Sequence, residues 1–349
     1  MEKLAVEILA EIFGMAFTDG GYTARSVALV NKHFNAVSLP LRYNYVALEG
    51  SDGKFEKFLE GFMKVCEGYK GASTIRVRHL FLDANISAAS IYRHQGPREK
   101  SPVEEISMTI LRTVADGLET LTCANFAPEI MQDLAAEPLR FPKLRELTVS
   151  SPVSGLLRSN GINPSMLDVP FPVLERLHIA CAGMKGWNVY APNLKYLRLS
   201  ALNDGFLYND VINSMKSEEG SPFSRLSTLI LQVEAYPSGW LRLGEPSAEH
   251  EHYVEELWAS QAESDIPVYF LPPLQRLDIR ACWKSRIEGG EGCWAVEERY
   301  ARATYATEDS DTLPEYLQAP PLGDPTPSDV KHMRGRGHPC LFFKESLRL

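Results

Sequence analysis

The sequence lacks any long uninterrupted apolar run. Glu2 and Glu7 break the apolar residues at its start, which excludes the continuous apolar stretch of a secretory signal. No later stretch approaches the roughly 18 uncharged apolar residues that a membrane-spanning helix needs. We therefore expect a cytoplasmic or nuclear protein without a membrane partner.

Cysteine is also scarce. The 349 residues include six cysteines, which are far apart and form no CxxC pair. This spacing excludes a disulfide-rich fold and a zinc site built from paired cysteines. We expect most of the six to be small, buried, apolar side chains in a reducing compartment.

Familiar catalytic motifs are absent as well. The chain contains no GxxxxGK[ST], GxGxxG or GxSxG pattern. The segment Glu249-His250-Glu251-His252 does not have the HExxH spacing of a metal site, and we interpret it as a solvated acidic surface. The sequence therefore predicts a protein that is not an enzyme, with no catalytic residues, no cofactor and no metal. An enzyme on an unfamiliar template is the least favoured alternative.

Positive charge is in deficit. The formal net charge is −9, so the chain as a whole offers no attraction to phosphate backbones or anionic membranes. A basic cluster at residues 331–338 has no interleaved aromatic side chains for base stacking, and we interpret it as a solvated turn. We therefore expect no nucleic-acid partner, and favour proteins as binding partners.

What the sequence does contain is a recurring phrase: an apolar residue, two variable residues, Leu, one variable residue and another apolar residue. Its copies cover residues 77–82, 118–123, 144–149, 174–179, 194–199, 226–231 and 274–279. The last two apolar positions are two residues apart, so they share one face of a strand, and the residue between them lies on the other face. The phrase predicts seven strands, each with one core face and one display face.

The phrase resembles the leucine-rich repeat, over residues 75–285 with an insertion at about 233–270. The resemblance implies an α/β solenoid of parallel strands with helical or irregular return segments. A helix that begins at Ser101 and has Glu104 in a capping box fits one such return. A protein substrate would then contact the concave display face at Thr148, His178, Arg198 and Asp278. The alternative is a generic α/β sheet whose buried strands contain the phrase.

Residues 1–49 have a different pattern. Two short amphipathic helices are predicted, separated by a turn at Asp19-Gly20-Gly21, and a third short element follows from Leu39 to Leu48. Three small helices cannot bury all of their apolar surface by themselves. They must therefore pack against a neighbour or a partner.

The stretch Leu4-Ala5-Val6-Glu7-Ile8-Leu9-Ala10-Glu11-Ile12-Phe13 resembles the opening of the F-box family, Leu-Pro-x-Glu-Ile-Leu-x-x-Ile-Phe, with Ala5 in place of the usual Pro. Residues 29–34 resemble its second half. The resemblance implies a substrate receptor of an SCF-type cullin-RING ubiquitin ligase, which binds a Skp-type adaptor and the cullin complex. The residues that it implies as adaptor-facing or supporting are Leu4, Val6, Ile8, Leu9, Ile12, Leu29, Val30 and Phe34.

These patterns predict four parts of an α/β protein. They are an F-box-like helical module at 1–49, a connecting helix within 50–74, the repeat domain at 75–285, and a C-terminal cap and tail at 286–349, with a helix expected near 294–307. The alternative function is a leucine-rich-repeat scaffold or recognition protein without ligase association. In that interpretation the N-terminal helices only cap the solenoid.

Overall fold

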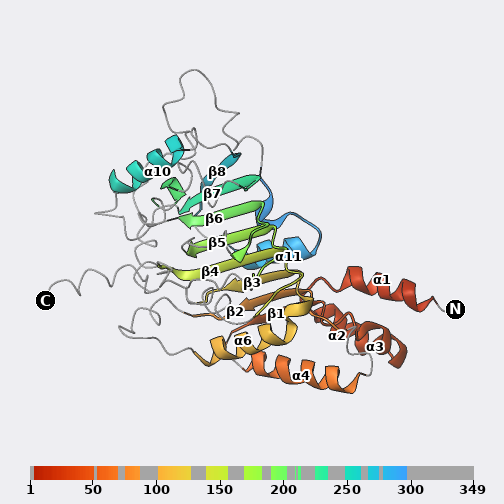
Figure 1. Cartoon of the computed structure of the whole chain (residues 1–349). Helices are drawn as coiled ribbons and strands as arrows, with labels where there is room; N and C mark the ends of the chain where they lie inside the picture. Colours follow the sequence, from red (N-terminus) through yellow and green to blue (C-terminus); the bar gives the residue numbers. More distant parts are fainter. Residues whose placement is uncertain are drawn as a thin grey trace, which may run out of the picture.

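One all-parallel sheet forms the centre of the protein in the computed structural model, and its eight strands lie side by side in chain order (Figure 1). The structure describes residues 4–50, 53–69, 75–86, 101–126, 139–155, 169–182, 190–202, 209, 211–213, 225–234, 248–260, 266–274 and 278–296. The strands are β1 (Tyr45–Glu49), β2 (His79–Asp83), β3 (Thr120–Ala124), β4 (Glu146–Gly155), β5 (Arg176–Ala182), β6 (Tyr196–Leu202), β7 (Thr228–Glu234) and β8 (Val268–Leu274). The α/β class is thus confirmed.

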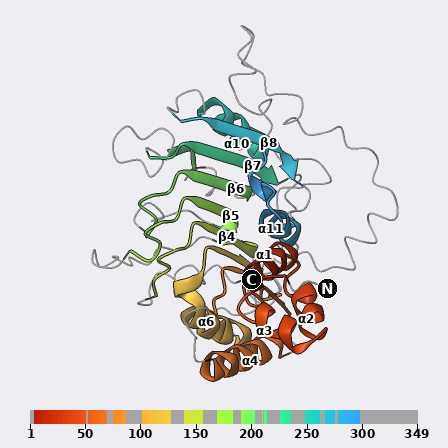
Figure 2. The same ribbon diagram turned by 90° about the vertical axis from the view of Figure 1, so that its right-hand side faces the viewer.

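Helices flank this sheet at its two ends and along its faces (Figures 1 and 2). They are α1 (Val6–Ala16), α2 (Tyr22–Ala28), α3 (Lys32–Ser38), α4 (Lys54–Gly68), α6 (Pro102–Val114), α10 (Ala248–Ser260) and α11 (Ile279–Ile287), with short 3-10 turns η2 (Ala115–Gly117) and η4 (Gly292–Trp294). The capping box expected at the start of α6 is present, since Ser101 accepts from the backbone of Glu104 and the Glu104 carboxylate accepts from Ser101.

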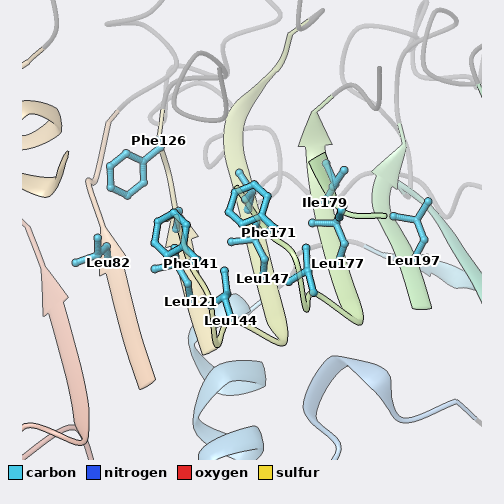
Figure 3. Close-up of a cluster of buried hydrophobic side chains, with 14 of the residues drawn as sticks. Leu82, Leu121, Phe126, Phe141, Leu144, Leu147, Phe171, Leu177, Ile179 and Leu197 are labelled. Atoms are coloured by element: carbon cyan, nitrogen blue, oxygen red, sulfur yellow. The ribbon is translucent and has the colours of Figure 1, made fainter. Parts of the chain in front are cut away.

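The recurring phrase places a leucine at the same register position in successive strands. Leu80, Leu121, Leu147, Leu177, Leu197 and Leu229 are aligned across β2 to β7. All six side chains are buried. Figure 3 shows four of these leucines on successive strands, together with the stacked rings of Phe141 and Phe171 from the turns before β4 and β5. Six of the seven predicted strands, and the predicted core face, are confirmed.

The seventh predicted strand is wrong. Strand β8 ends at Leu274, where the predicted strand would begin, and α11 begins at Ile279. Pro272 and Pro273 lie within β8, at the edge of the sheet, where a missing backbone N–H is tolerated. Asp278 therefore caps α11, accepting from the backbone N–H of Ala281 at 2.9 Å, and is not on the sheet.

The third N-terminal element, which was predicted as a helix, contains a strand instead. Residues 45–49 form β1, which pairs in parallel with β2. Alternation explains the strand, because Val46 and Leu48 enter the main core, whereas Tyr45 and Ala47 lie on the opposite face. The sheet therefore begins inside the segment that the sequence assigned to a separate helical module.

Candidate protein-binding surface

Helices α1 to α3 pack around a small core of their own at the β1 end of the sheet (Figures 1 and 2). Phe13 is at its centre, with its ring centroid 5.4 Å from that of Phe17 and 5.3 Å from that of Phe34. Leu9, Ala24 and Val37 complete the buried part of this core. Three short helices around so few side chains leave most of their other apolar residues outside.

The apolar residues of α1 to α3 that lie outside this helical core form the largest concentration of exposed apolar side chains in the part of the chain that the structure describes. Of ten large exposed hydrophobic residues, eight lie between residues 4 and 30. They are Leu4, Val6, Ile8, Ile12, Met15, Tyr22, Leu29 and Val30, which we call the N-terminal apolar surface. Leu29 is 87% exposed and Ile8 is 46% exposed, so this surface faces solvent and not the sheet.

The backbone explains how the adjacent residues Leu29 and Val30 are presented to solvent. Helix α2 ends with backbone hydrogen bonds from Leu29 to Ser26 and from Val30 to Val27. Helix α3 then begins at once, because the Asn31 side chain accepts from the Phe34 backbone N–H at 2.8 Å. The tight junction between two helices projects Leu29 and Val30 outward.

Six of the eight residues that the F-box resemblance implies lie on the N-terminal apolar surface. The other two, Leu9 and Phe34, point into the helical core, where Phe34 packs edge-on against Phe13. Leu9 and Phe34 can therefore support the surface but not form its outer layer. Met15 and Tyr22 belong to the surface and were not identified from the sequence; Met15 lies one helical turn after Ile12, which is the signal that could have identified it.

The predicted substrate-binding residues have a different environment. Thr148, His178 and Arg198 are aligned across β4, β5 and β6 on the face opposite the leucines, as expected, and we call this the second face. All three are at least 94% buried: their exposed fractions are 6%, 0% and 5%. The second face is therefore not an open display surface.

Residues 278–294, which we call the cover segment, lie over this face. Arg286 of α11 donates through its Nε and Nη2 atoms to Glu146 Oε2 of β4, at 3.0 and 2.9 Å. Trp283 packs on Phe81 of β2 with 5.5 Å between ring centroids, and Arg280 Nη1 donates to Glu49 Oε2 of β1 at 2.7 Å. This cover was not predicted, although Trp283 and Trp294 in a largely polar segment were a signal for it.

Beneath the cover segment, Arg198 is at the centre of a buried polar network. Its Nη2 donates to Gln232 Oε1 at 2.6 Å, its Nε donates to Ser200 Oγ at 2.9 Å, and its Nη1 donates to the carbonyl oxygen of Cys293. Ser200 Oγ also lies 3.1 Å from His178 Nε2. Burial, together with the Arg198 charge, holds the pKa of His178 well below its usual value.

The C-terminal helix expected near 294–307 is only partly within the described residues. Trp294 ends the 3-10 turn η4, its ring packs edge-on against His178 at 6.3 Å, and the backbone then becomes extended at Ala295. Residues 297–307 lie outside the described part of the chain. Trp294 therefore closes the cover segment and does not begin a helix.

Comparisons and searches for other sites were negative. No protein-family model matches the chain, and no curated protein is significantly similar to it. In the described ranges, no three or more His, Cys, Asp or Glu side chains are grouped so that they could hold a metal ion. The helices of that same part of the chain include none long and apolar enough to cross a membrane.

Proposed function

We propose that the chain is a substrate receptor of an SCF-type cullin-RING ubiquitin ligase and docks on a Skp-type adaptor through the N-terminal apolar surface. The observation that carries the proposal is the exposure of six residues that the F-box resemblance had implied from sequence alone. Exposed apolar patches of this kind mark protein-binding sites in soluble proteins. In this role the chain supplies binding and orientation, while the ubiquitin-transfer chemistry belongs to other subunits.

The energetics support a protein partner for this surface. Burying one Leu, Ile or Val side chain contributes about 1.5–3 kcal/mol. Leu29, Val30 and Ile8 alone therefore offer a substantial part of a stable interface. Glu7 and Glu11 are also exposed on α1 beside Ile8 and Ile12, so the partner must pair these carboxylates or leave them in water.

The sheet supplies the second half of the proposal. Eight parallel strands in chain order, with aligned leucines in β2 to β7 and valines at the same register in β1 and β8, are what a leucine-rich-repeat solenoid would have. In the proposed receptor, this domain carries the protein substrate. Thr148, His178 and Arg198 would contact a substrate only after the cover segment had moved away, whereas Asp278 is exposed on the cover segment itself.

A repeat scaffold or recognition protein without ligase association is the second candidate. The observation in its favour is that the helical core continues into the sheet: Leu41 and Tyr45 pack against the same cluster as Phe13. An end cap of a solenoid would pack in this way. A cap alone, however, leaves the outward side of α1 and the α2–α3 junction without a role.

Binding of the full chain to a purified Skp-type adaptor, measured by calorimetry, tests the proposal. Ile8→Asp and Leu29→Asp should each weaken binding at least about tenfold, which corresponds to about 1.4 kcal/mol. Met63→Asp and Val173→Asp are matched controls, because these side chains are 41% and 38% exposed but lie elsewhere, and they should leave binding unchanged. If the parent chain does not bind any adaptor, or if the control substitutions weaken binding equally, the result contradicts the proposal and favours the scaffold candidate.

A further inference from the structure

Two cysteines that the sequence did not suggest as a pair come together in the cover segment. Cys282 lies in α11 and Cys293 in η4, and the chain reverses between them through Gly289, whose φ is +90°. The two thiols lie close enough for each to change the pKa of the other. The close approach extends to the backbone, since a Cβ on Gly292 would lie 2.6 Å from the Cys282 carbonyl oxygen.

The charge beside this pair favours a thiolate. Arg198 is 5% exposed, and its hydrogen-bond partners in the part of the chain that the structure describes are the neutral oxygens of Gln232, Ser200 and Cys293. A buried cation held only by neutral oxygens stabilises any negative charge that forms nearby. The neighbouring Cys293 thiol and the Arg198 charge together lower the pKa of Cys282 to about 7, against the opposing effects of burial and Asp278.

The two thiols differ in a way that assigns them different roles. Cys282 is half-buried, so a small reagent can reach it, whereas Cys293 is buried. The pKa of Cys293 is raised well above its usual value, because it lies next to the Cys282 thiol and because it is buried. Cys282 is therefore the nucleophile of the pair and Cys293 is the thiol that resolves it.

The other free cysteines of the described residues lack this environment. Burial alone raises the pKa of Cys123 to about 12. Cys66 in α4 is half-buried as well, but burial and the neighbouring Glu67 raise the pKa of its thiol. Cys66 is thus a matched internal control with similar exposure and no activating partner.

We propose that Cys282 and Cys293 are a redox-active dithiol that hydrogen peroxide converts into an intramolecular disulfide. The Cys282 thiolate attacks one peroxide oxygen; an S–O bond forms, the O–O bond breaks, and the released hydroxide takes up a proton to become water. The Cys293 sulfur then loses its proton and attacks the sulfenic sulfur; the S–S bond forms, and the S–O bond breaks to release a second water. Two thiols lose two electrons in total, and one peroxide gains them.

The disulfide would fix the cover segment in its closed position. Cys293 supplies the carbonyl oxygen that binds Arg198, and the next residue, Trp294, packs on His178. Joining η4 covalently to α11 therefore opposes exposure of the second face. The dithiol chemistry does not depend on the proposed ligase role, because it involves only residues of the cover segment and β6.

Alkylation of the reduced full-length protein at pH 7, read by peptide mass spectrometry, gives the first test. The Cys282 thiol should react at least about tenfold faster than the Cys66 thiol, because only thiolates react. Equal rates at the two cysteines would overturn the assignment of Cys282 as the nucleophile.

Peroxide treatment followed by trypsin gives the second test. Cleavage after Lys284 and Arg286 separates the two cysteines, so the proposed disulfide appears as a linked peptide pair. Cys293→Ser should stop the reaction at a Cys282 sulfenic acid that a cyclic dione traps, and Cys66→Ser should leave the linked pair unchanged. The proposal fails if the parent protein yields no linked pair while Cys66 is oxidised at a comparable rate.

Discussion

Arg198 of β6 donates a hydrogen bond to the Cys293 carbonyl oxygen, and this contact joins the middle of the sheet to the cover segment. The same guanidinium also binds Gln232 of β7 and Ser200 of its own strand. The cover segment is thus held on the second face by hydrogen bonds from a buried charge and not by apolar packing alone. This arrangement makes the stability of the cover segment sensitive to a few polar side chains.

Replacing Arg198 should open the cover segment. Arg198→Leu leaves the Cys293 carbonyl oxygen and the Gln232 side chain without their donor, at a cost of about 1–3 kcal/mol for each unsatisfied buried group. Hydrogen exchange should accelerate in residues 278–294 more than in β2 or β3. Arg78→Leu is the control, because the Arg78–Glu119 pair is exposed and contributes at most about 1 kcal/mol. Unchanged exchange in residues 278–294 would contradict this account.

Removing a leucine from the register-matched row should destabilise the whole sheet. Leu147 of β4 is fully buried between Leu121 and Leu177, so Leu147→Ala should lower the free energy of unfolding by about 2–5 kcal/mol. Val173→Ala, in the turn before β5, should cost less than about 0.5 kcal/mol because Val173 is exposed. Denaturant titration of both variants measures the difference, and similar losses would show that the row is not the main core.

Acidification should destabilise the protein through its buried histidines. Burial lowers the pKa of His79 to about 4, whereas in the unfolded chain it is near 6.5. Between these values the unfolded state binds a proton that the folded state does not, so stability falls as the pH drops from about 6.5 toward 4. His178 acts in the same direction, because burial and the Arg198 charge lower its pKa as well.

Denaturant titrations at pH 7 and pH 5 measure this effect. His79→Gln, which removes one of the two groups while keeping a side chain able to bond Thr120, should reduce the loss of stability between the two pH values. His33→Gln is the comparison variant, since His33 is exposed on α3 and should leave the difference unchanged. A loss of stability that persists in full in His79→Gln would assign it to other groups.

Short-range patterns determined much of the fold. The alternation of apolar residues in the recurring phrase was sufficient to locate β2 to β7, because a strand with one buried face shows its period in the sequence. The capping residues of α6 and the apolar faces of α1 and α4 could likewise be recognised from the sequence. The apolar character of residues 4–30 also pointed to a surface in need of a partner, since three short helices cannot bury it.

Only the tertiary structure decided how long-range groups meet. Tyr45 to Glu49 became a strand because β2 offered it an edge to pair with, and Leu274 ended a strand because α11 turned back over the second face. The same return buried Thr148, His178 and Arg198 and brought Cys282 to Cys293. The sequence records which residues are apolar at each position, but the burial of a polar side chain depends on which distant segment covers it, and no local pattern encodes that choice.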